Sequence, residues 1–131
     1  EAERLLRSAL ERTPDAAELH HALGLSLIRQ QRGKEALAQL QRAADLAPEQ
    51  PRYAYVFAIA LNDDGQQALA RQRLEQALGL HPHDLDLLRA LAIYEMESGN
   101  HAAALTLAKR LLALDRNNPD AHQLVQWLQR R

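Results

Sequence analysis

Apolar residues recur every three or four positions along most of the chain, which is the spacing of one face of an α-helix. The pattern stops at regular intervals, because Pro14, Pro48 and Pro82 follow three such runs and lie 34 residues apart. Proline lacks a backbone N–H and disfavours a helical conformation in the residue before it, so each proline ends a helix. The pattern predicts no strand and helices at about residues 1–12, 16–30, 34–46, 51–63, 67–80, 84–98, 101–114 and 119–130.

The chain divides into 34-residue units that carry the same kind of residue at equivalent positions. Position one of successive units is occupied by Ala17, Pro51, Leu85 and Pro119. The large apolar residues at position seven are Leu23, Phe57, Leu91 and Val125, and the small residues at position eight are Gly24, Ala58 and Ala92. Alanine occupies position twenty in Ala2, Ala36, Ala70 and Ala104. A large position beside a small one gives each helix an apolar stripe with a notch for its neighbour.

A second break lies inside each unit. Gly65 and Gly99 occupy equivalent positions, where glycine can adopt the left-handed conformation that ends a helix. Each unit is therefore expected to be a hairpin of two helices. In the first unit Gln31 occupies this position and Gly33 follows two residues later, so a turn of a different shape is expected there.

The segments LHHALGLSL and EALAQLQRAADLAP resemble the tetratricopeptide repeat, a 34-residue helix hairpin with Leu-Gly at positions seven and eight. The resemblance implies an all-α, right-handed superhelical solenoid whose first helices line a concave groove. It divides residues 1–131 into one array: a second-helix remnant (1–14), full repeats (17–50, 51–84 and 85–118) and a closing helix (119–131). Because the sequence opens within a helical pattern, we expect it to be a fragment of a longer protein.

Some positions depart from the family pattern. Position four, usually tryptophan, is occupied by His20, Ala54, Leu88 and His122. Arg116 replaces the fourth proline, and Ala108 with Leu111 invert the large and small positions of the third unit. These departures leave the packing near residues 104–116 open.

Composition narrows the classes of partner. A net charge of −1 gives no general attraction to nucleic acid or to an anionic membrane, so neither is expected as a partner. No cysteine is present, which excludes disulfides and thiolate metal sites within this sequence, and no apolar run is long enough to cross a bilayer. The basic residues are almost all arginine, which suggests a bacterial gene, with the cytoplasm and the periplasm both open.

The family geometry implies a binding surface on the first helix of each hairpin, at positions two, five, nine, twelve and thirteen. The candidate groove residues are His21, Leu25, Ile28, Tyr55, Ile59, Asn62, Arg89, Ile93, Met96 and Trp127. Position nine is apolar in every unit and has polar neighbours, which favours docking of an apolar peptide or helix. The lysines and asparagines with which chaperone-binding members of the family hold a C-terminal carboxylate are absent, so binding of a chaperone tail is not expected.

Two other interpretations stay open. The apolar stripe can be internal packing in a scaffold that self-associates or docks on its own missing domain, with Trp127 filling the closing helix as a cap. Alternatively, the chain is an accessory arm of a larger enzyme or electron-transfer protein. The segment RYAYVFAIALNDDGQ resembles repeats in the tails of bacterial multihaem cytochrome-type proteins.

No catalytic constellation is predicted. The segment HPHD at residues 81–84 offers two imidazoles and a carboxylate, but these lie in a linker without a fourth ligand at a suitable spacing. Glu95, Glu97 and His101 are explained by a charged helix end followed by a turn. No phosphate-binding loop or nucleophile elbow is present, so we expect a protein-binding module with no enzymatic activity, metal or cofactor.

Overall fold

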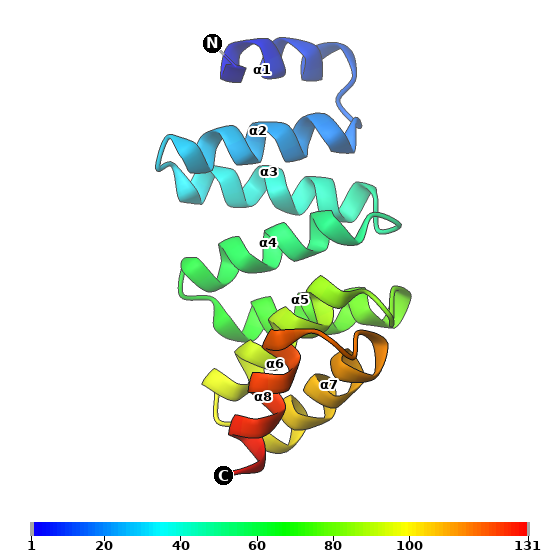
Figure 1. Cartoon of the computed structure of the whole chain (residues 1–131). Helices are drawn as coiled ribbons and strands as arrows, with labels where there is room; N and C mark the ends of the chain where they lie inside the picture. Colours follow the sequence, from blue (N-terminus) through cyan, green and yellow to red (C-terminus); the bar gives the residue numbers. More distant parts are fainter. Residues whose placement is uncertain (1, 131) are drawn as a thin grey trace. The chain divides into compact units, whose positions relative to one another are not determined.

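The computed structural model describes residues 2–130, and every regular element within this range is an α-helix. The helices are α1 (Ala2–Arg12), α2 (Ala17–Arg29), α3 (Gly33–Leu46), α4 (Pro51–Asp63), α5 (Gln67–Leu80), α6 (Leu85–Glu97), α7 (His101–Leu114) and α8 (Pro119–Gln129) (Figure 1). Their bounds agree with the predicted helices to within one residue, apart from the predicted start at Glu1, which lies outside the described residues. No helix in this range combines the length and the apolar character needed to cross a membrane.

The chain forms two compact units, which are described separately. The N-terminal unit extends to Ala70 and the C-terminal unit begins at Arg71, so the boundary falls within α5. In the N-terminal unit α2 and α3 form an antiparallel hairpin (Figure 1). Its core contains Leu23, Leu27 and Ala36, and the half-buried Leu6 and Leu10 of α1 pack against them.

Position eight provides close helix contact, as the sequence pattern predicts. A Cβ atom placed on Gly24 of α2 lies only 2.6 Å from Cδ2 of Leu40 in α3, and Leu40 is fully buried. The leucine therefore occupies the space that any larger residue at position 24 needs.

The C-terminal unit resolves the open question about residues 104–116. Ala108 and Leu111 both have 0% of their surface exposed, and α7 runs unbroken through them to Leu114. Ala108 joins Ala104, Val125 and Leu128 in one buried cluster of α7 and α8. The inversion of large and small residues is therefore accommodated by regular helix packing.

The turn after α2 corrects one expectation. Gln31 adopts a φ of 59°, in the left-handed region that Gly65 (85°) and Gly99 (87°) occupy after α4 and α6. The same backbone hydrogen bond closes all three turns, from Arg32 to Leu27, from Gln66 to Leu61 and from Asn100 to Glu95, at 2.8–2.9 Å. The expected difference in shape at Gln31 is therefore wrong, because the closing hydrogen bonds hold a non-glycine residue in this conformation.

The histidines at position four of α2 and α8 form hydrogen bonds with the linker that precedes each helix. Nε2 of His20 donates to the carbonyl oxygen of Pro14 at 2.7 Å, and Nδ1 of the same ring lies 2.8 Å from the side-chain amide of Gln39. Nε2 of His122 lies 2.6 Å from the carbonyl oxygen of Arg116. The two linker residues stand at the same repeat position, so histidine has the same structural role in both repeats.

Candidate peptide-binding surface

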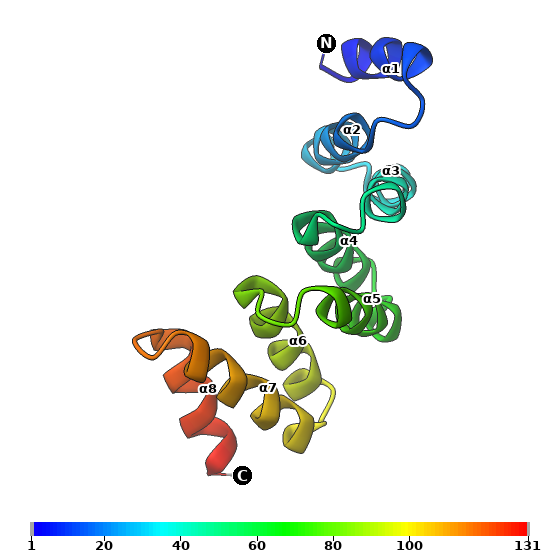
Figure 2. The same ribbon diagram turned by 90° about the vertical axis from the view of Figure 1, so that its right-hand side faces the viewer.

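Six of the ten candidate residues lie on α2 and α4 of the N-terminal unit. They form two stripes with i, i+4, i+7 spacing, which places each stripe on one helix face: His21, Leu25 and Ile28 on α2, and Tyr55, Ile59 and Asn62 on α4. Figure 2 shows α2 and α4 on the same side of α3. Ile28 is 40% exposed and the other five are half-buried, so this surface is neither core nor fully open. We call these six residues the N-terminal patch.

His21 contributes packing and not hydrogen bonding to this patch. Its ring lies 4.5 Å from the ring of Tyr53, centre to centre, and its Nδ1 atom is buried without a hydrogen-bond partner. Burial, together with the nearby charge of Arg52, lowers the pKa of His21 below its ordinary value of 6.5. The two neighbouring histidines therefore differ, because both ring nitrogens of His20 have hydrogen-bond partners whereas Nδ1 of His21 has none.

A cavity of about 290 Å³ lies at the Ile28 end of the patch, lined by Ile28, Gln31, Gly33, Ala60, Asp63 and Asp64. Asp64 accepts hydrogen bonds from Gln66 at 2.8 Å and from Lys34 at 3.2 Å, and these two contacts lower its pKa. The cavity thus combines an apolar wall with carboxylates at its edge.

The other four candidates lie in the C-terminal unit. Arg89, Ile93 and Met96 share one face of α6, and Trp127 lies on α8. The guanidinium of Arg89 lies 3.4 Å from the carboxylate of Asp86 and 4.0 Å from that of Asp120. It therefore links α6 to α8 and is balanced by acidic groups on both helices. We call these four residues the C-terminal patch.

Met96 and Trp127 also belong to the packing of the last hairpin. Both contact the buried cluster formed by α7 and α8. The Trp127 ring meets the His101 ring edge-on, with centres 5.6 Å apart and planes at 84°. These contacts favour the interpretation of Trp127 as a cap residue, although its side chain remains partly exposed. Among the candidates on α6, Arg89 and Ile93 are not part of this packing.

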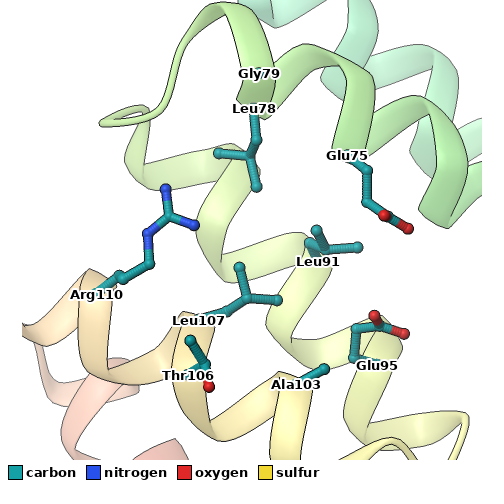
Figure 3. Close-up of a pocket in the computed structure, with 9 residues that line it drawn as sticks. All are labelled: Glu75, Leu78, Gly79, Leu91, Glu95, Ala103, Thr106, Leu107 and Arg110. Atoms are coloured by element: carbon teal, nitrogen blue, oxygen red, sulfur yellow. The ribbon is translucent and has the colours of Figure 1, made fainter.

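A second cavity, of about 480 Å³, lies in the C-terminal unit and is not predicted by the sequence pattern (Figure 3). Two of its lining residues are charged: Glu95 is half-buried and paired with Arg71, and Arg110 is exposed and donates to the Pro82 carbonyl oxygen. Within residues 2–130 no three histidine or acidic side chains come close enough to hold a metal ion.

A family model of the tetratricopeptide repeat matches residues 1–58 and 61–128. The chain therefore belongs to the tetratricopeptide repeat family, an all-α solenoid fold whose members act as protein–protein interaction modules.

Relatives and solved structures agree with this assignment. The cytochrome c-type biogenesis protein CycH of Pseudomonas aeruginosa is 29% identical over 124 residues, which are 92% of this chain and 30% of that protein. The structure of MamA matches with a TM-score of 0.86 and 17% identity, over 98% of this chain and 75% of MamA. The first repeat domain of Spaghetti (RPAP3), bound to the HSP90 peptide SRMEEVD, matches with a TM-score of 0.78 and 18% identity, over 87% of this chain and 90% of that domain. The chain thus spans about a third of the length of the curated relatives it matches.

Proposed function

We propose that the N-terminal and C-terminal patches bind an apolar peptide, or one face of an amphipathic helix, from a partner protein. The observation that carries the proposal is the contrast between positions seven and nine. Leu23, Phe57 and Leu91 at position seven are at most 3% exposed. Leu25, Ile59 and Ile93 at position nine are only half-buried, although they are equally apolar. Accessible apolar side chains with polar neighbours are typical of a binding surface.

Charge pairing in the C-terminal patch favours an apolar contact over recognition of an acidic group. Arg89 is already paired with Asp86 and Asp120, so the cluster of these three side chains carries a net negative charge. The RPAP3 domain holds an acidic peptide on the same fold, but its likeness to this chain concerns the fold alone. We expect the peptide SRMEEVD not to bind here, because carboxylates at the patch repel it.

Selection from a random peptide library tests the proposal, since it requires no identified partner. A phage-displayed library is selected on the immobilised wild-type chain, and recovered sequences are retested on the Tyr55→Ala/Ile93→Ala variant. The Leu5→Ala/Leu114→Ala variant is the matched control, since it removes two exposed leucines outside the patches. Apolar peptides that bind wild type and control but not the patch variant support the proposal. Equal binding to all three proteins contradicts it.

The relationship to CycH favours a second candidate, a role in cytochrome c biogenesis. The alignment covers 92% of this chain, and that relative is described as a cytochrome c-type biogenesis protein. Deleting this segment from the gene in its source organism tests the idea. Loss of the absorbance of c-type cytochromes, restored by the wild-type segment, supports this role, and an unchanged spectrum contradicts it.

A further inference from the structure

The cavity of about 480 Å³ in the C-terminal unit lies on the opposite side of α6 from Ile93. Its lining residues come from the end of α5, from α6 and from α7, and include Leu78, Leu91, Glu95, Ala103 and Leu107. Leu91 and Glu95 each stand two residues from Ile93, and two residues on an α-helix turn through about 200°. The cavity is therefore separate from the C-terminal patch.

The repeat pattern explains why space is left here. Leu91 stands at position seven, where the preceding repeat has Phe57, and Ala103 stands at position nineteen, where that repeat has Leu69. Both replacements are smaller, so less side-chain volume is available to close the gap between α5 and α7 over α6. Because Ala103 and Glu75 are exposed, this gap is open to solvent at the surface and is not a void in the core.

The walls of the cavity combine an apolar floor with charges of opposite sign on opposite sides. Leu78, Leu91 and Leu107 form the floor, with Glu75 and Glu95 on one side and Arg110 on the other (Figure 3). The hydroxyl of Thr106 is turned back to the Ala102 carbonyl oxygen at 3.1 Å, so it offers no free donor to the cavity.

The two carboxylates differ in what they can still bind. Glu95 has a side chain only 13% exposed and already accepts from Arg71 Nε at 3.3 Å and from Asn100 Nδ2 at 2.9 Å. Within the described residues Glu75 makes no ion pair and is exposed to solvent. The acidic side of the cavity thus holds one unneutralised charge next to leucine side chains.

We propose that this cavity binds a large apolar side chain of a partner peptide in which a lysine or arginine is adjacent to that residue. The apolar side chain covers Leu78, Leu91 and Leu107, and the basic group lies beside Glu75. The unit then has two binding faces on α6, and occupancy of this one does not depend on the C-terminal patch.

Titration of the isotope-labelled chain with the blocked dipeptides acetyl-Lys-Phe-amide, acetyl-Glu-Phe-amide and acetyl-Lys-Ala-amide tests the proposal, with backbone amide NMR shifts as the readout. We expect acetyl-Lys-Phe-amide to give saturable shifts at Gly79, Ala103 and Leu107 with a dissociation constant of about 1 mM, and the other two to bind more weakly. Shifts confined to residues around Ile93, or no saturable shift with any dipeptide, overturn the proposal.

Two variants and one control make the test specific to the cavity. Ala103→Leu introduces the residue that the preceding repeat has at this position and is expected to weaken binding about tenfold or more. Ala102→Leu, at an exposed neighbouring position outside the cavity lining, is expected to leave binding unchanged. Glu75→Gln is expected to abolish the preference for the lysine over the glutamate dipeptide. If Ala103→Leu perturbs the fold, the result with Glu75→Gln alone tests the proposal. A retained preference in Glu75→Gln, or wild-type affinity in a folded Ala103→Leu, overturns the proposal.

Discussion

Leu40 lies directly against the backbone of Gly24, so that a Cβ atom at position 24 comes within 2.6 Å of Leu40 Cδ2 and 2.7 Å of its Cγ. Alanine is ordinarily better than glycine inside a helix by about 0.5–1 kcal/mol. Here the clashing side chain is fully buried, so its displacement disturbs packed neighbours, and we expect Gly24→Ala to destabilise the chain by about 1–3 kcal/mol in urea unfolding.

A glycine-to-alanine substitution at an unobstructed helix position is the control for the predicted loss of stability in Gly24→Ala. Gly79 lies within α5, and a Cβ atom there meets nothing within 4 Å, so Gly79→Ala is expected to be stabilising by about 0.5–1 kcal/mol. The Gly24→Ala/Leu40→Ala double variant should lose less stability than the sum of its single variants, because the clash is absent. Additive losses would show that Leu40 is not the obstacle.

Gln31 offers a site where glycine should be stabilising. Its φ of 59° lies in the left-handed region, which is unfavourable for a residue with a Cβ atom and not for glycine. We expect Gln31→Gly to raise the free energy of unfolding by about 1 kcal/mol, and Gly65→Ala or Gly99→Ala to lower it by a similar amount. Urea midpoints of the three variants provide the measurement, and a loss of stability in Gln31→Gly would contradict the argument.

His21 should make stability depend on pH. Burial and Arg52 lower its pKa in the folded chain below 6.5, so the unfolded chain binds the proton more readily. The full stability is therefore present above pH 6.5, and part of it is lost as the pH falls from there towards the folded-state pKa. Replacing the ring by His21→Phe should reduce the difference in unfolding free energy between pH 7.5 and 5.5. His83→Gln, in an exposed linker, serves as the control and should leave that difference unchanged.

The helix bounds could be predicted closely because proline and glycine act on the local backbone, as at Pro48 and Gly65. Buried positions could be predicted because the same residue type recurs at each repeat position that faces a neighbouring helix. Leu23 at position seven and Ala36 at position twenty are examples, and both are fully buried. The turn at Gln31 could not be predicted, since glutamine does not favour the left-handed conformation, which the backbone hydrogen bond from Arg32 to Leu27 closes.

The candidate surfaces are harder to predict from sequence. The repeat alignment shows smaller residues at Leu91 and Ala103, but it does not show that side chains from three helices enclose one cavity there. The stripe at position nine is visible in the sequence, but its half-burial and the paired state of Arg89 depend on distances between helices. The contact of Trp127 with the buried cluster also depends on the packing of α8 on α7, which the sequence pattern does not give.

Peptide affinity and stability measured together test the central claim, that the half-buried residues of the two patches serve binding whereas the fully buried Leu23 serves folding. With a peptide recovered by selection, calorimetry and urea unfolding are performed on wild type, Tyr55→Ala/Ile93→Ala and Leu23→Ala. We predict that the patch variant loses at least about tenfold in affinity with a small change in unfolding midpoint. Leu23→Ala, at a fully buried site, should lose about 2–5 kcal/mol of stability. A patch variant that binds like wild type, or that loses stability as Leu23→Ala does, would contradict the account.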